Sequence, residues 1–336
     1  GLLKLTKEQR KAAFEQAAQR IGMPAKAVEK DWWVTLTLKA LFISKYKDFM
    51  VFKGGTSLSK CWGLIERFSE DIDIGLAPEA FDMKHEKDPT SGFIKKLKQG
   101  GYEFTKTNLK AEIEKQFSIL GIPNDLLIIE EEHRVEGNSY PDPYALYVVY
   151  PSLFDKNLYL ADLVKIEVSV RTLKEPKAII KIQSLLYEVF PNEVYKEIPF
   201  EVVAVEAQRT FLEKMFLLHE EFQKPDPLKI KSERMSRHLY DLEVMMDKEP
   251  GIKALANKEL YQIIIEHRKI YNTIANIDYT LHKESEISFI PPDSISDAYN
   301  KDYNTMKEVM IYGDALAFDD LIKRLNELLE RFRTRN

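Results

Sequence analysis

The spacing of apolar residues along the chain predicts two kinds of element. Residues 6–21 and 25–44 repeat apolar positions every three or four residues, which is typical of amphipathic helices, and Thr6 is placed to cap the first of them. Short apolar or alternating runs, typical of β-strands, lie at 49–53, 70–76, 144–150 and 163–170. Beyond residue 205 almost every stretch has the helical period again. The pattern therefore predicts an α+β chain, mixed in its first half and mainly helical in its second.

Pro176 interrupts the chain soon after the last of these strands and suggests a domain boundary. We therefore expect a mixed α/β domain over residues 1–176 and a mainly helical domain over residues 177–336, with a boundary nearer residue 200 as the alternative. Residues 77–139 mix helix-like stretches with loops and have no clear pattern. The chain has 336 residues and is 44% hydrophobic, which is enough for two cores.

Composition narrows the classes of protein that fit. The formal net charge of -5 argues against a protein that coats DNA, so no DNA partner is expected. The single cysteine, Cys61, excludes an internal disulfide and fits a reducing compartment, so we expect a cytoplasmic protein. No apolar run reaches the roughly 18 residues of a membrane span, and the N-terminal pattern is that of an amphipathic helix rather than a signal sequence. The histidines and the cysteine lack the spacing of a zinc site.

A pair of glycines interrupts the chain directly after the strand at 49–53. Gly54 and Gly55 allow the backbone to turn sharply and to approach a ligand closely. The residues that follow predict a helix over 57–68, which Thr56 can cap. Because the first N–H groups of a helix are free and its amino end is positive, this corner is suited to a phosphate group.

Two carboxylates follow on the next predicted strand. Asp71 and Asp73 are two residues apart, which places them on one face, while the apolar residues that alternate with them face a core. Neighbouring carboxylates repel each other unless a cation lies between them, and Mg²⁺ prefers oxygen ligands from carboxylates and phosphates. Glycines and acids in this order predict a site for a nucleoside triphosphate (NTP) with two Mg²⁺ ions, the arrangement that assists in-line displacement at phosphorus.

A site with two metal ions usually needs a further carboxylate. Glu167 lies on the strand at 163–170 and shares its face with Lys165, while the opposite face is apolar. Asp162 is the rival candidate, but it lies at the start of that strand and on the apolar side. We therefore predict that Asp71, Asp73 and Glu167 are the catalytic, metal-binding acids.

The order of these motifs resembles the polymerase-beta-type nucleotidyltransferase fold, in which a mixed sheet with flanking helices carries the site. More closely, the chain is similar to the AbiEii/AbiGii family of toxins from toxin–antitoxin and phage-abortive systems. The stretches that carry the resemblance are VEKDWWVTLTLKALF (28–42), KGGTSLSK with FSEDIDIG (53–75), RTFLEKMFLLHEE with RHLYDLEVM (209–245) and DYNTMKEVMIYG (302–313).

The resemblance assigns further residues to the nucleotide site. It implies that Gly55 and Thr56 hold the triphosphate and that Asp71 and Asp73 bind Mg²⁺. It adds two flanking residues of these motifs, Lys53 and Ser69, and three residues of the helical half, Lys214, Arg237 and Asp241. The sequence departs from the family pattern at His238, where an aspartate is common, so that position has no expected role.

The resemblance also implies an activity and partners. The expected reaction moves a nucleotide from an NTP to an acceptor, and RNA, in particular the end of a tRNA, is the acceptor it favours. Basic residues at 224–237 and 331–335 could contact a phosphate backbone, although charged runs are usually only solvated. A cognate antitoxin is implied as well. The alternatives are transfer to a protein or small-molecule hydroxyl, and a nucleotide-binding module without catalysis.

Overall fold

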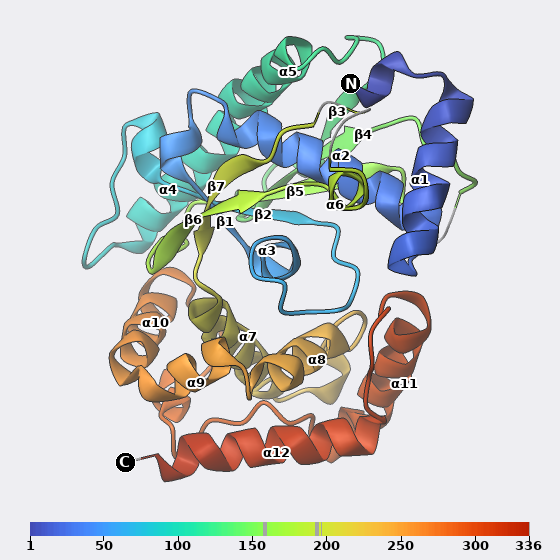
Figure 1. Ribbon diagram of the computed structural model, residues 1–336. Coiled ribbons are helices and arrows are strands. Elements are labelled where there is room, and N and C mark those ends of the chain that lie inside the picture. Colours follow the sequence, from blue (N-terminus) through green and yellow to red (C-terminus); the bar gives the residue numbers. More distant parts are fainter. Residues whose placement is uncertain (157–159, 192–194, 196, 336) are drawn as a thin grey trace. The chain divides into compact units, whose positions relative to one another are not determined.

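The computed structural model describes residues 1–156, 160–191, 195 and 197–335, and the chain forms two compact units (Figure 1). The first unit is formed by Gly1–Cys61 together with Phe68–Val205. The second is formed by Trp62–Arg67 together with Glu206–Asn336. The boundary expected near residue 176 therefore lies inside the first unit, and the alternative near residue 200 is closer to the observed one.

The first unit is built on a mixed β-sheet, as the sequence predicted. In the described part of the chain seven strands pair in the order β3-β4-β5-β2-β1-β7-β6. The parallel pairs are β2 with β5 and β1 with β7, and the other neighbours are antiparallel. The strands are β1 (Met50–Lys53), β2 (Ile72–Leu76), β3 (Ile128–Glu131), β4 (Tyr144–Val149), β5 (Leu163–Ser169), β6 (Lys177–Ile182) and β7 (Phe200–Val205).

Alternation along the central strands separates the core from the site. On β2, Ile72 and Ile74 are fully buried, whereas Asp73 between them is half-buried. On β5, Val164, Ile166 and Val168 are likewise buried between more accessible polar residues. Because side chains of a strand point alternately to opposite faces, the apolar rows of both strands face the core and the acids face away from it.

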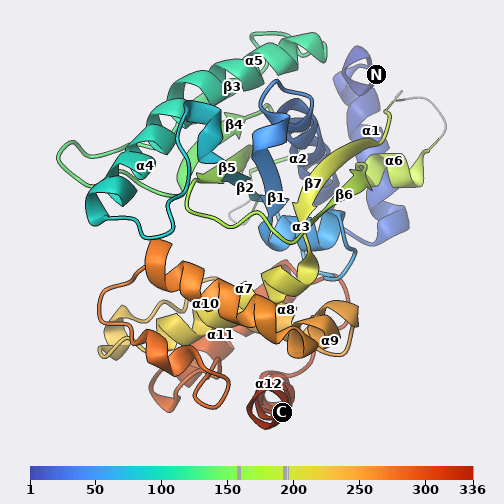
Figure 2. The ribbon, with the colours of Figure 1, turned by 90° about the vertical axis from the view of Figure 1, so that its left-hand side faces the viewer.

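Two helices predicted at the N-terminus are confirmed. The first, α1 (Lys7–Ile21), begins with a capping box in which Thr6 and Gln9 bond each other's backbone, and it ends at Gly22 in the left-handed conformation. The second, α2 (Ala25–Phe42), lies across one face of the sheet (Figures 1 and 2). Trp32 and Trp33 are buried in it. The other helices of this unit are α3 (Gly54–Lys60), α4 (Ser91–Phe104), α5 (Lys110–Ile119) and α6 (Leu185–Val189).

The helix predicted over residues 57–68 was wrong in its bounds. The helix α3 begins earlier, at Gly54, and it ends at Lys60. Residues 62–67 belong to the second unit, where their backbone groups bond to side chains and to a distant segment. Lys248 donates to the carbonyl of Leu64 at 3.1 Å, and the amide of Tyr312 donates to the carbonyl of Glu66 at 3.0 Å. These tertiary bonds use the carbonyl groups that a continued helix would need.

The second unit is helical, as predicted. Its helices are α7 (Ala207–Phe222), α8 (Ser236–Met245), α9 (Glu249–Ala256), α10 (Lys258–Tyr271), α11 (Asp293–Val309) and α12 (Phe318–Thr334). The apolar stripe of α7, which includes Phe211, Met215 and Leu218, is completely buried and forms the centre of this unit's core. Among the described residues, no helix has both the length and the apolar composition needed to cross a membrane.

Candidate active site

Three adjacent strands bring one basic and two acidic residues into register. On the antiparallel pair β1 and β2, Lys53 lies opposite Asp73, and on the parallel pair β2 and β5, Asp73 lies opposite Glu167. Strands in a sheet are about 4.8 Å apart, so residues paired in this way are direct neighbours. The structure thus places Glu167 beside Asp73, although the two residues are 94 positions apart in the chain.

Gly54 is shaped to the carboxylate beside it. Its φ of +78° is in the left-handed region, where a side chain is strained. A Cβ atom at this position would lie 2.0 Å from Oδ2 of Asp73, closer than any real contact. The Asp73 carboxyl therefore occupies the space that a side chain would need. The next residue, Gly55, lies in the first turn of α3 and is half-buried.

Thr56 ties the amino end of α3 to the chain segment that carries the acids. Its hydroxyl donates to the carbonyl of Asp71 at 2.5 Å and lies 2.9 Å from the hydroxyl of Ser69. Since the single proton of Thr56 is used on the carbonyl, Ser69 donates in the second bond. Thr56 does not cap a helix, as the sequence had suggested, because Lys53 holds the position before α3. It instead connects the glycine corner to the acids.

The charges around Asp73 are unbalanced. Burial, together with the negative charges of Glu167 and Asp71, raises the pKa of Asp73 to about 7, although Lys53 acts in the opposite direction. The pKa of Glu167 is lowered: burial opposes ionisation, but Lys165 donates to its Oε1 at 2.6 Å and Asp73 shares a proton with it. The two carboxyls thus titrate as a pair, in which the proton is held more tightly by Asp73 than by Glu167.

The donor set is suited to a hard cation. Asp73 and Glu167 offer carboxylate oxygens side by side, and a divalent cation would take the place of the shared proton. Among the described residues, no three His, Cys, Asp or Glu side chains are gathered closely enough to enclose a metal ion. The structure therefore brings Asp73 and Glu167 together without gathering all three predicted acids around one point. Mg²⁺ commonly uses one or two carboxylates and completes its shell with substrate phosphates and water.

The rival acid, Asp162, has another partner. Lys26 of α2 forms an ion pair with its Oδ1 at 2.6 Å and donates to the carbonyl of Asp155 at 2.8 Å. Asp162 precedes the first residue of β5, whereas Glu167 lies in register with Asp73. The geometry therefore favours Glu167 as the second acid of the pair.

Of the predicted nucleotide-site residues in the second unit, Lys214 and Asp241 belong to a buried ion cluster. The guanidinium of Arg67 donates to both oxygens of Asp241 at 2.7 Å, and the ammonium of Lys214 lies 2.9 Å from the second of them. The pKa of Asp241 is far below its usual range: burial opposes ionisation, but the two cations outweigh it. Asp241 therefore neutralises Arg67 and Lys214, and it is fully buried.

His238 completes this cluster at the position where the sequence departs from the family pattern. Its Nδ1 accepts from Lys214 at 3.2 Å, and burial and the adjacent cations Lys214 and Arg237 keep its pKa well below the usual value. A neutral imidazole thus holds the lysine. Arg237, on the first turn of α8, is half-buried.

The sequence pattern missed several charged residues that hold these sites together. Arg67 was passed over because it lay inside a predicted helix. Lys30 and Asp31 were passed over because they lie in an apolar helix, yet both are buried and paired, with Glu70 and Lys60 respectively. Charged residues side by side in such an apolar helix are a signal that could have revealed them.

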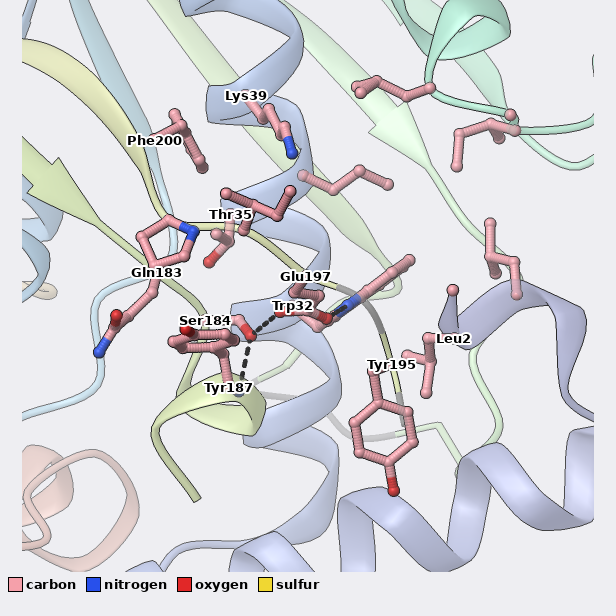
Figure 3. A pocket seen from close by; sticks show the side chains of 18 of the residues that line it. Leu2, Trp32, Thr35, Lys39, Gln183, Ser184, Tyr187, Tyr195, Glu197 and Phe200 are labelled. Carbon is pink, nitrogen blue, oxygen red and sulfur yellow. Dashed lines mark hydrogen bonds between the residues drawn. The ribbon is translucent and has the colours of Figure 1, made fainter. Parts of the chain in front are cut away.

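A mainly apolar cavity of about 220 Å³ lies elsewhere in the first unit, between α2, the start of α6 and the residues before β7 (Figure 3). Trp32 and Ser184 both donate to the carboxylate of Glu197 there. The residues predicted for the nucleotide site are not among the described residues that line this cavity.

Comparison with known proteins agrees with the geometry. The model of the family described as nucleotidyl transferase AbiEii toxin, type IV toxin–antitoxin system, matches residues 37–324. No curated protein matches the chain. The match covers most of the sequence, and it confirms the nucleotidyltransferase fold and the resemblance. Membership in a type IV toxin–antitoxin family implies a cognate antitoxin. The chain belongs to the AbiEii family of nucleotidyltransferase toxins.

Proposed function

We propose that this toxin moves a nucleotide from an NTP onto a hydroxyl of RNA, in particular at the end of a tRNA, in a Mg²⁺-dependent reaction. Asp71, Asp73 and Glu167 hold two Mg²⁺ ions, and Lys53, Gly54, Gly55, Thr56 and Ser69 form the wall against which the triphosphate binds. The observation that carries the proposal is the register of Asp73 with Glu167, with Gly54 packed directly against the Asp73 carboxyl.

In the proposed reaction the acceptor oxygen forms a bond to the α-phosphorus as the bond from that phosphorus to the bridging oxygen of the β-phosphate breaks. Pyrophosphate leaves, and Glu167 accepts the proton of the acceptor hydroxyl. Bound Mg²⁺ would supply neutralisation of the charge on the leaving group. The contribution of the chain is to hold the acids and the triphosphate in line, which is the main requirement of phosphoryl transfer.

By the family resemblance, we also propose Lys214, Arg237 and Asp241 as nucleotide-binding residues. Lys214 and Arg237 would supply positive charge to a phosphate. Asp241 would act indirectly, because its two oxygens are engaged by Arg67 and Lys214.

The choice of RNA is supported by exposed cations between α7 and α8. Lys229, Lys231 and Arg234 are exposed there and can contact a phosphate backbone. The basic residues near the C-terminus are less suited to contact RNA, because they form ion pairs within the chain. Arg331 bonds to Asp247 at 2.7 Å and Arg335 to Glu284 at 2.6 Å. We therefore place the RNA contact at the loop over residues 224–234.

A labelling experiment tests the proposal. The protein is incubated with Mg²⁺, each α-labelled NTP in turn and total RNA, and the RNA, protein and small-molecule fractions are then separated. We expect label in RNA, retained after protease treatment, and a loss of at least about 100-fold with Asp73→Asn. Label found only in protein or in small molecules would contradict an RNA acceptor, and equal labelling by Asp73→Asn would contradict the site itself.

A further inference from the structure

The acids and the glycine corner are separated in the chain by residues 62–67, which belong to the second unit. Within the first unit, α3 ends at Lys60, and the chain returns at Phe68, just before Ser69. The spacing between the triphosphate corner and the acids is therefore not set by a short connecting turn. The β1–β2 ladder and the hydroxyl of Thr56 join the corner to the acids, and other contacts of the first unit hold the carboxyl end of α3 and the segment just before Asp71.

Two consecutive residues of α2 hold the end of α3 and the segment just before Asp71. The ammonium of Lys60 lies 2.5 Å from Oδ1 of Asp31, and Lys30 forms an ion pair with the carboxylate of Glu70. All four side chains are at most 10% exposed. One pair is thus at the carboxyl end of α3 and the other is next to Asp71, and both are anchored one residue apart on the same helix.

The Lys30–Glu70 pair also decides which way the acids face. Glu70, Ile72 and Ile74 are buried, while Asp71 and Asp73 between them are only half-buried. Glu70 therefore continues the buried row of β2, and its charge is met there by Lys30. With Glu70 held on that side, Asp71 and Asp73 are directed to the opposite one, where Thr56 bonds to the carbonyl of Asp71.

The helix α2 is itself firmly anchored at this point. The other oxygen of Asp31 accepts from the amide of Leu185 at 2.7 Å, and Lys30 donates to the carbonyl of Ala161 at 3.0 Å. The next residue, Trp32, donates to Glu197, which also accepts from Ser184, the residue that caps α6 (Figure 3). Lys30 and Asp31 thus lie on a helix whose position is determined by several buried contacts.

We infer that Lys30 and Asp31 are positioning residues of the nucleotide site: through Glu70 and Lys60 they set the distance and orientation between the acids and the glycine corner. The inference rests on the proposed function, since it assigns these residues to the same site. Neither residue touches the triphosphate. They hold Glu70, which is the neighbour of Asp71, and Lys60, at the end of α3, as the outer residues around a metal site hold its ligands in place.

The test compares Lys30→Met with Lys26→Met. Lys26 lies one turn earlier on α2 and is also buried, and its ion pair is with the partly exposed Asp162 rather than with a residue next to Asp71. Two quantities are measured: hydrogen exchange of residues 69–73, and binding of α,β-methylene NTP analogues with Mg²⁺ by calorimetry. We expect Lys30→Met to speed exchange at residues 69–73 and to weaken Mg²⁺–analogue binding about 10- to 100-fold, with neither change in Lys26→Met. Lys30→Arg, which keeps the charge, should recover most of the binding.

Equal effects of Lys30→Met and Lys26→Met on both measurements would overturn the inference. If Lys30→Met does not fold, Asp31→Asn and Glu70→Gln are compared with Lys26→Met in the same way. Failure of the wild-type protein to bind any analogue would instead contradict the proposed function. The exchange rates of residues 69–73 would still decide whether Lys30 positions the acids, so the two failures are distinguishable.

Discussion

Asp73 is the central residue of the candidate active site. It is the middle member of three residues in register, it is shared by two strand pairs, and its carboxyl fills the space beside Gly54. Burial and two neighbouring acids raise its pKa to about 7, so without a cation the group is only partly ionised near neutral pH. A carboxyl held in this state is a natural ligand for a metal that arrives with its nucleotide.

The raised pKa has a consequence for stability without metal. The folded protein binds the Asp73 proton more tightly than the unfolded chain, whose reference value is 3.8. The stability that this provides is complete below that value and is lost as the pH rises toward about 7. We expect melting temperatures measured in a chelator to fall more steeply over this window for the wild type than for Asp73→Asn. Parallel curves for the two proteins would show that Asp73 does not titrate in this way.

Gly54 has a partner that its sequence position alone does not reveal. We expect Gly54→Ala to lose at least about 100-fold in transfer rate, because its methyl group must displace the Asp73 carboxyl. Gly22→Ala is the matched control, since Gly22 has nearly the same φ, +79°, with nothing near its missing Cβ. Both variants should lose about 1–2 kcal/mol of stability from backbone strain. Similar transfer rates in the two variants would contradict the contact with Asp73.

The residues of the site were predictable from the sequence to different degrees. Asp71, Asp73 and Gly54 were found because alternation and glycine chemistry are local signals. Glu167 was found as a carboxylate on an amphipathic strand, but its register with Asp73 depends on strand order, which no local pattern contains. The partners of the buried lysines were not predictable, because Lys30 and Glu70 are brought together only by the packing of α2 on the sheet.

At the scale of elements, the central strands β1, β2, β4 and β5 were predicted from alternation and apolar runs, and β6 and β7 were not. The residues of β6 do alternate, with Lys177, Ile179 and Lys181 exposed on the edge of the sheet. The apolar run of β7 directly precedes α7 and was not separated from the region around it. Missing both strands placed the expected boundary near Pro176 instead of after Val205. The helix α3 was predicted too long because tertiary bonds capture residues 62–67.

The two candidate acids near β5 are Asp162, just before the strand, and Glu167, on it, and a pair of variants decides between them. We expect Glu167→Gln to reduce transfer by at least about 100-fold, because it removes a carboxylate in register with Asp73. Asp162→Asn should keep nearly the full rate and lose only stability, since Asp162 pairs with Lys26. Transfer assays on the two purified variants check this. The reverse order of the two rates would identify Asp162 as the metal ligand.

At the scale of the whole molecule, the stretch of chain between the glycine corner and the acids belongs to the second unit. Residues 62–67 belong to the unit of α7 and α8, although the glycine corner before them and the acids after them belong to the other. Arg67 is bonded to Asp241, and the carbonyl of Glu66 accepts from Tyr312. Gly313 leaves room for the side chain of Glu66, because a Cβ there would lie 2.1 Å from its carboxylate.

The buried ion cluster of the second unit should govern that unit's stability. We expect Asp241→Asn to cost about 3–5 kcal/mol, because it removes the buried carboxylate that Arg67 and Lys214 share. Asp247→Asn is the control, since Asp247 is 54% exposed and should cost less than about 1 kcal/mol. The free energy of unfolding of both variants is measured by denaturant unfolding that is monitored by hydrogen exchange. In Asp241→Asn, residues 64–67 should lose protection together with α8, and equal losses in the two variants would refute a dominant role for the cluster.

The central claim is that Asp73 and Glu167 grip the metal of a bound NTP while the glycine corner holds its phosphates. The most direct measurement is a crystal structure of the wild-type protein with Mn²⁺ and an α,β-methylene NTP analogue, with the metal located by its anomalous signal. The account predicts a metal peak within about 2.5 Å of carboxylate oxygens of both acids, and a triphosphate against Gly54–Thr56. A metal and nucleotide bound elsewhere, with the Asp73 carboxyl unchanged, would contradict it.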